Sequence, residues 1–191
     1  MSTYKKADLS GAEWISTGGA CMTPMIRKTM FFPKVKSAKI TIAGLGIFEA
    51  FINGKRVSED LFLPLSTDFH ERPEKLYRGV PYGEKMRHRL YCPVYDITSY
   101  LKEGDNTIAF LMGPGWYEMP NECYEYGHIK LCYVIDYQDE KGEEHRTGSD
   151  GSHRWKESYV KKANLLKGEV HDYRDYDETW MQTPYDDSDW A

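Results

Sequence analysis

The stretch from Asp96 to Tyr117 constrains the fold more than any other part of the chain, because it predicts a strand that ends, one helical turn and a new strand. The side chain of Asp96 can cap the exposed amides of the turn, and Leu101 is expected to enter the core. Gly104 can take the left-handed conformation that ends such a turn. An apolar run then leads to a glycine-rich turn at 113–115. This order of residues is typical of a sheet protein that presents loops.

The rest of the chain also favours strands, because short alternating or apolar runs recur while helical periodicity is nearly absent. Asn53-Gly54 predicts a type I′ hairpin, since both central residues of that turn need positive φ, and Lys141-Gly142 marks a second hairpin. Strands are expected at Arg27–Phe32, Ala38–Ala43, Ile47–Ile52, Leu90–Tyr95, Thr107–Met112 and Ile129–Tyr137, with weaker ones near Arg56, Tyr77, His145 and Val170. The alternating faces of these strands predict an all-β sandwich core.

A length of 191 residues predicts one domain. We expect a single module over 1–191, with an N-terminal extension over 1–25 and a C-terminal segment over 168–191 that leads to a next domain. The acidic and aromatic C-terminal stretch stops one residue after Trp190 without a closing element, which indicates a domain boundary.

Charge and hydropathy exclude two classes of partner. The formal charge is −5 and the basic residues alternate with acids, so the electrostatic footprint of a nucleic-acid-binding protein is missing. No window approaches the ~20 apolar residues of a membrane helix, which predicts no membrane partner. Residues 1–6 lack the apolar core of an export signal, but a signal peptide could have been removed, so the compartment stays open.

Cysteine and histidine spacing predicts no zinc site. The four cysteines show no C-x-x-C pair and are expected to be buried free thiols. The six histidines form neither an i, i+4 pair nor a zinc-type spacing with a cysteine.

Several motifs in a fixed order resemble the N-terminal β-sandwich domain of bacterial alpha-L-rhamnosidases, which are large multidomain glycoside hydrolases. The motifs are W-I at 14–15, R-K-T-M-F at 27–31, G-L-G-I-F-E-A-F-I-N-G-K-R-V at 44–57, L-P-L-S-T-D-F at 63–69, Y-D-I-T-S-Y-L-K-E-G-D-N at 95–106, G-P-G-W-Y at 113–117, W-K at 155–156, G-E-V-H-D-Y-R at 168–174 and D-D-S-D-W at 186–190. The central motifs are also similar to the sugar-binding jelly-roll domains of other glycosidases. The resemblance therefore implies a jelly-roll β-sandwich that is galactose-binding-domain-like, with long loops and one short helical turn.

The resemblance also implies that the catalytic carboxylates lie in a separate helical barrel downstream, so no catalytic residue is expected here. Carboxylate pairs in a chain with 30 acidic residues do not by themselves indicate a glycosidase site. We expect a non-catalytic module of an alpha-L-rhamnosidase-like enzyme that contributes to recognition of rhamnose-containing carbohydrate. The alternative is a purely structural module that orients the catalytic barrel and binds no sugar.

Two loops hold the candidate carbohydrate-binding residues. The segment at 66–86 is long and polar, and its Asp68 and Arg72 could hold vicinal hydroxyl groups or form a surface ion pair. The second loop offers the aromatic pair Trp116 and Tyr117, as a sugar platform or as a core-edge anchor. It continues with the candidates Glu118, Asn121 and Tyr124.

No cofactor is required by this interpretation, but calcium is a candidate. Some related modules bind L-rhamnose through calcium, and Asp68 and Asn121 offer the hard oxygen ligands that such an ion needs. In the C-terminal segment, Glu169, Asp172 and Arg174 are candidates for contact with the remaining domains of the same polypeptide. Alternation places Glu169 and Asp172 on opposite faces of an extended segment.

Overall fold

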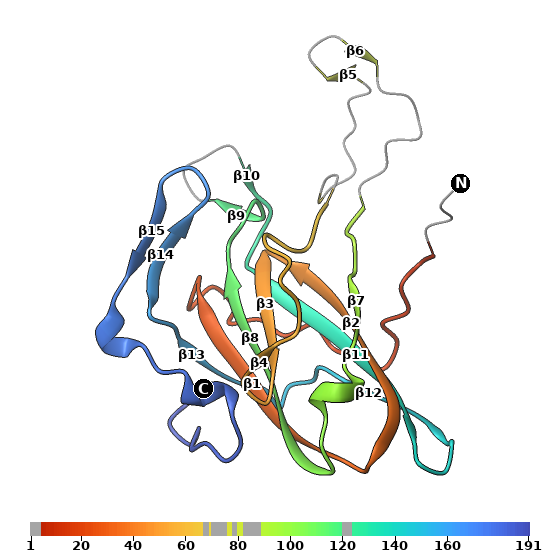
Figure 1. Ribbon diagram of the computed structural model, residues 1–191. Helices are drawn as coiled ribbons and strands as arrows, with labels where there is room; N and C mark the ends of the chain where they lie inside the picture. Colours follow the sequence, from red (N-terminus) through yellow and green to blue (C-terminus); the bar gives the residue numbers. More distant parts are fainter. Residues whose placement is uncertain (1–4, 67–68, 70–75, 78–79, 82–88, 120–123) are drawn as a thin grey trace.

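The computed structural model describes residues 5–66, 69, 76–77, 80–81, 89–119 and 124–191, and they form a sandwich of two antiparallel sheets (Figure 1). The five-stranded sheet has the order β13 (Arg154–Glu157), β1 (Pro24–Phe32), β8 (Gly104–Gly113), β3 (Ile47–Ile52) and β4 (Lys55–Arg56). The four-stranded sheet has the order β12 (Glu144–Gly148), β11 (Lys130–Asp139), β2 (Val35–Leu45) and β7 (Val94–Asp96). The all-β sandwich expected from the alternating runs is confirmed.

Short two-stranded sheets and 3₁₀ turns lie outside the two main sheets of the sandwich. Three two-stranded sheets pair β5 (Leu76–Tyr77) with β6 (Val80–Pro81), β9 (Glu118–Met119) with β10 (Tyr124–Glu125), and β14 (Val160–Asn164) with β15 (Gly168–His171). Single 3₁₀ turns are η1 (Thr98–Tyr100), η2 (Tyr173–Asp175) and η3 (Thr179–Met181). Within the described residues, no helix is long and apolar enough to span a membrane.

The main core lies between the two sheets. Phe110 of β8 and Tyr133 of β11 meet across it with ring centroids 5.2 Å apart. The predicted inward face of β11 is buried, and Leu131, Tyr133 and Ile135 are each 0% exposed. Burial of such large apolar side chains is the main favourable term in the folding of this sandwich.

The predicted turn chemistry is confirmed except for the stop. The Oδ1 atom of Asp96 accepts a hydrogen bond from the Thr98 amide at 2.9 Å. Gly104 has a positive φ of +102°, but it begins β8, and the helical turn η1 ends earlier, where Leu101 takes an extended conformation. Asn53 and Gly54 have φ +51° and +79° and join β3 to β4. Glycine and asparagine reach this region with little strain, which is why the hairpin forms at this pair.

The strand predicted over Leu90–Tyr95 is shorter in the structure, where β7 begins at Val94. Pro93 has no amide hydrogen to donate, although its carbonyl accepts a hydrogen bond from Ile42 at 3.1 Å. The sequence interpretation also missed β13 and β14. Both are rich in charged residues and find partners only through tertiary pairing.

A second apolar cluster covers the outer face of the five-stranded sheet. Trp180 and Trp190 from the C-terminal segment pack there with Met25 and Ala109. The backbone of Ala191 exchanges two hydrogen bonds with Trp155 of β13, at 2.8 and 3.0 Å. The C-terminal segment is therefore part of the packed domain, as its place beside β13 in Figure 1 also shows.

Candidate functional site

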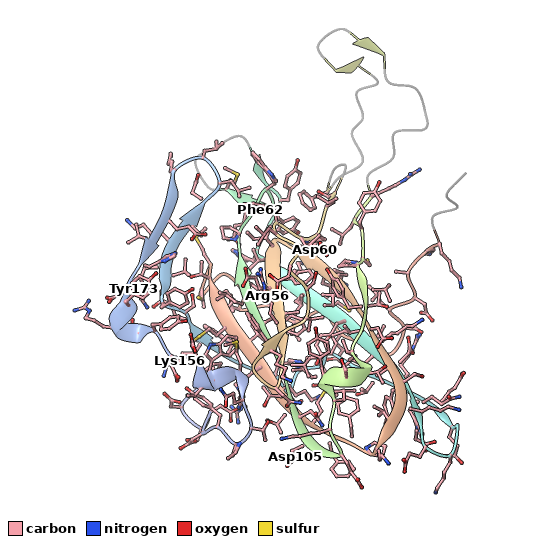
Figure 2. All side chains as sticks on the ribbon, in the orientation of Figure 1. Arg56, Asp60, Phe62, Asp105, Lys156 and Tyr173 are labelled. Carbon is pink, nitrogen blue, oxygen red and sulfur yellow. The ribbon has the colours of Figure 1, made fainter. Side chains whose placement is uncertain are left out.

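The candidate site lies at one end of the sandwich, which we call the loop end. It consists of the loop at 57–66, the turn at 113–117, β9 with β10, and the tip of the β14–β15 hairpin. Figure 1 shows these elements gathered at the same end of the two sheets, and Figure 2 labels Phe62 there.

The aromatic pair in the 113–117 turn divides into two roles. Tyr117 is 7% exposed. Its ring lies edge-on to the Phe69 ring, with the centroids 5.0 Å apart, and stacks on the Tyr126 ring, with the centroids 5.9 Å apart. Burial, and then the nearby charge of Glu118, raise the pKa of the Tyr117 hydroxyl. Trp116 is 51% exposed. Tyr117 therefore anchors the turn, while half of the Trp116 side chain faces solvent.

Glu118 is engaged by the protein itself. Its Oε2 atom accepts a hydrogen bond from the Ile129 amide at 3.0 Å, and its Oε1 atom lies 3.1 Å from Nδ1 of His128. The residue is 9% exposed. Because both oxygens have partners, Glu118 fastens β9 to the chain entering β11, and this is the simpler explanation of its position.

A cavity of about 200 Å³ is lined in part by Pro114 and Gly115, which directly precede Trp116 in the sequence. The other lining residues are Ile47, Phe62, Ala163, Asn164, Leu165, Gly168 and Glu169. Its wall is mainly apolar, with an amide and a carboxylate as polar groups. The structure thus brings the second predicted loop together with Glu169, which the sequence interpretation had assigned to a domain contact.

Sequence reasoning missed Phe62 and the cavity. Phe62 is 64% exposed and has φ +58°, an uncommon conformation for a bulky residue. A usable signal was present, because Leu61, Phe62 and Leu65 form an apolar run that no alternating pattern assigns to the core, and all three are exposed.

The three candidate residues of the C-terminal segment do not form one group. Glu169 lines the cavity and accepts a hydrogen bond from His171 at 2.8 Å. Asp172 pairs with Arg174 and caps η2 by accepting a hydrogen bond from the Arg174 amide at 3.1 Å. These hydrogen bonds from the Arg174 side chain and backbone lower the pKa of the Asp172 carboxyl.

Four ring side chains cluster on the surface next to η2. Their centroids lie 4.9 to 5.9 Å apart, and they belong to Tyr159, His171, Tyr173 and Tyr176. Tyr173 is 70% exposed, and Figure 2 shows it on the outside of the C-terminal segment. We call this group the tyrosine surface.

Several predicted ligands cannot be placed. Asp68, Arg72 and Asn121 lie outside the described residues, and Tyr124 is described only as part of β10. The calcium site predicted at Asp68 and Asn121 therefore stays a prediction.

The two packed sheets and their loop end define the class of the protein, a jelly-roll β-sandwich module. The sequence profile of the alpha-L-rhamnosidase N-terminal domain matches residues 33–77 and 80–191, and the chain belongs to this family.

Individual relatives agree with the family assignment. An alpha-L-rhamnosidase of Streptomyces avermitilis is 28% identical over 165 residues, which cover 82% of this chain and 14% of that protein. The crystal structure of Streptomyces avermitilis alpha-L-rhamnosidase complexed with L-rhamnose superposes with a TM-score of 0.74, at 26% identity over 88% of this chain and 15% of that one. Alpha-L-rhamnosidase from Dictyoglumus thermophilum gives a TM-score of 0.71, at 26% identity over 94% of this chain and 19% of that one. The chain spans 14–17% of the length of the curated relatives that it matches.

Proposed function

We propose that this chain is a non-catalytic module of an alpha-L-rhamnosidase-like enzyme and that its loop end contributes to recognition of rhamnose-containing carbohydrate. The observation that carries the proposal is a cavity lined by Phe62, Asn164 and Glu169, in the same loop end as the exposed Trp116, which follows the lining residue Gly115 in the sequence. Aromatic rings pack against the apolar faces of sugars, and amide and carboxylate groups bind hydroxyl groups.

The size and lining of the cavity favour a small deoxy sugar. Its volume of about 200 Å³ lies below the ~300–1,000 Å³ of typical drug-sized ligand sites, so it would hold one ring rather than a chain of sugars. L-Rhamnose carries a methyl group where most hexoses carry a hydroxymethyl group, and the apolar wall suits that methyl group.

The non-catalytic part of the proposal rests on the carboxylates. Glycoside hydrolysis uses two carboxyl groups that face one another across a sugar, about 5–10 Å apart. Among the residues that line the described cavity, Glu169 supplies the carboxylate, and Glu118 is held by His128 and Ile129.

The test is titration of the chain with L-rhamnose and other monosaccharides by calorimetry, first with calcium and then with a chelator. We expect Trp116→Ala and Phe62→Ala to weaken rhamnose binding about 10-fold or more, as loss of a stacking aromatic does at about 1–3 kcal/mol. Phe31→Ala is the matched control, because Phe31 is 69% exposed on β1, outside the loop end. Absence of heat with every sugar would overturn the recognition function. Binding lost in the chelator would support the calcium site.

The tyrosine surface supports a second function, in which the module orients another domain of the same polypeptide. A cluster of exposed aromatic side chains is typical of protein interfaces. In the longer polypeptide, Tyr173→Ser and Tyr176→Ser would then lower the thermal stability of the assembled enzyme while leaving that of this chain unchanged. Equal stability of the assembled enzyme with and without these substitutions would contradict this function.

A further inference from the structure

The hairpin between β11 and β12 carries a cluster of metal-ligating side chains at the end of the sandwich opposite to β9 and β10 (Figure 1). Ligand atoms of Asp139, Glu143 and His145 all lie within 4.8 Å of one another. The cluster contains an imidazole as well as two carboxylates, and it lies outside the site described above.

The turn holds Asp139 in position. Its Oδ1 atom accepts hydrogen bonds from the backbone amides of Lys141 at 2.9 Å and Glu143 at 3.0 Å. Gly142, at φ +86°, lets the turn close around this oxygen. With Oδ1 occupied, the Oδ2 atom is the one directed to His145, at 3.2 Å from Nε2. Such fixed outer contacts orient metal ligands in known sites.

The distance from Oδ2 of Asp139 to Nε2 of His145 suits two ligands that share one metal ion. Zinc bonds to nitrogen and oxygen ligands are about 2.0–2.2 Å long, so two ligands at a tetrahedral angle lie about 3.3 Å apart. The observed 3.2 Å means that an ion could replace the shared hydrogen with little movement of either side chain. The His145 ring is also held, because it stacks on Tyr137 at 5.0 Å with an angle of 20° between the rings.

Charge favours a cation at this turn. Residues 139–144, D-E-K-G-E-E, carry four carboxylates and one lysine. The local potential of this turn therefore attracts positive ions.

We propose that Asp139, Glu143 and His145 bind one divalent transition-metal ion such as Zn²⁺, with water at the remaining position. The imidazole nitrogen favours Zn²⁺, Co²⁺ or Ni²⁺ over Ca²⁺ and Mg²⁺, which prefer ligand sets made of oxygen. The turn alone accounts for Asp139, but it does not account for a third ligand and an imidazole whose ligand atoms lie within 4.8 Å of that carboxylate and of each other. The spacing D-x-x-x-E-x-H across a hairpin matches no common zinc motif, which is why the histidine spacing gave the opposite expectation.

The test measures uptake of Zn²⁺ by the tag-free chain in calorimetry, and the visible spectrum of Co²⁺ as a report on the ligand set. We expect one ion per chain, at least 10-fold weaker binding for His145→Gln, and a smaller loss for Glu143→Gln. Glu143→Gln serves as the variant least able to disturb the hairpin, because its side chain is exposed at the turn. Circular dichroism checks that each variant keeps the wild-type fold.

The matched control is His171→Gln. His171 also pairs with a neighbouring carboxylate, that of Glu169 at 2.8 Å, but the pair has no third ligand among the described residues. This variant should bind Zn²⁺ as the wild type does. The proposal is overturned if the wild type takes up no Zn²⁺ or Co²⁺, or if His145→Gln binds as tightly as the wild type. Because the assay uses no sugar, its result is independent of the proposed recognition function.

Discussion

Arg27 of β1 and Asp187 of the C-terminal segment form an ion pair across 160 residues of sequence, on the outer face of the five-stranded sheet. The Arg27 side chain is 1% exposed. Its Nε atom donates to the Trp180 carbonyl at 2.9 Å, its Nη2 atom donates to the Gln182 carbonyl at 3.2 Å, and its guanidinium lies 5.0 Å from the Tyr185 ring. The C-terminal segment thus closes over a buried cation that it also neutralises.

Asp187→Asn should therefore destabilise the chain strongly, because it leaves Arg27 buried without its counter-charge. Loss of one partner of a buried pair costs about 3–5 kcal/mol, and the 30% exposure of Asp187 lowers the expected cost to about 2–3 kcal/mol. Urea unfolding of the wild type and of Asp187→Asn measures this loss of stability. Asp189→Asn is the control, since the pair of Asp189 with Lys156 is exposed and should contribute less than about 1 kcal/mol. Equal midpoints for the two variants would contradict this role of Arg27.

Asn106→Asp tests a buried side chain that donates as well as accepts. Asn106 is 0% exposed, its Nδ2 atom donates to the carbonyls of Lys102 and Gly104 at 2.8 Å, and its Oδ1 atom accepts from Asn53 at 2.7 Å. A carboxylate would face two carbonyl oxygens with nothing to donate. We expect a loss of about 2–3 kcal/mol at pH 7.

The penalty in Asn106→Asp should shrink as pH falls, because burial beside carbonyls raises the pKa of the new carboxyl in the folded state. The part of the penalty that comes from ionisation is absent below the unfolded pKa and grows as pH rises toward the folded one. The neutral carboxyl still leaves one of the two carbonyls without a donor, so a smaller penalty remains in acid. Urea unfolding at two pH values measures this. In Asn164→Asp the replaced side chain accepts hydrogen bonds through Oδ1 from the amides of Leu166 and Lys167, at 2.8 and 3.0 Å, and a carboxylate can accept both. This control should therefore stay near wild type. A penalty that does not change with pH would contradict the prediction.

His153 should make the chain less stable in mild acid. Its Nδ1 atom lies 2.8 Å from the Asp150 carbonyl and so donates, which leaves Nε2 to accept from the Tyr133 hydroxyl at 3.0 Å. Burial lowers the pKa of His153, and the nearby charge of Lys28 acts in the same direction. The hydrogen bond to the Asp150 backbone and the charge of Asp150 oppose this shift but do not cancel it. The neutral ring is thus the folded form.

The sign of the effect follows from that shift. Because the folded pKa lies below the unfolded value, the unfolded chain binds the proton more readily, and this contribution to stability is lost as pH falls below about 6.5. The urea midpoint should drop between pH 7.5 and pH 5.5 in the wild type and drop less in His153→Gln. The difference between the wild type and His153→Gln separates the effect of protonating His153 from that of protonating the other histidines. Parallel pH profiles would show that His153 does not titrate in this way.

Tyr117→Ala and Trp116→Ala should differ in stability although the two residues are adjacent. Removal of the Tyr117 ring takes away a buried side chain and should cost about 3 kcal/mol. Removal of the Trp116 side chain should change the free energy of unfolding by less than about 1 kcal/mol, because half of it is exposed. Thermal unfolding of both variants measures this. A similar loss in both would mean that Trp116 is also an anchor.

Local chemistry made much of the fold predictable. The turn at Asn53-Gly54, the cap at Asp96 and the core-facing residues of β11 each depend on residues close in sequence, and each is confirmed. Most residues of the motifs that carry the family resemblance have structural roles in the domain. Asn53 bonds to Asn106, and the backbone of Trp155 pairs with that of Ala191, so motifs distant in sequence meet as neighbours in space.

The sequence by itself determined most strands of the two sheets, their turns and the residues that face the core, because these depend on backbone preferences and on a period of two. It did not determine β13 and β14, which form only through tertiary pairing. The tertiary structure alone decided which outward residues stay exposed. Arg27 is buried because the C-terminal segment folds over it, and Tyr117 is buried because Phe69 and Tyr126 lie against it, while the neighbouring Trp116 is 51% exposed. Burial of a given side chain depends on what packs against it, and that partner comes from parts of the chain whose position no local pattern records.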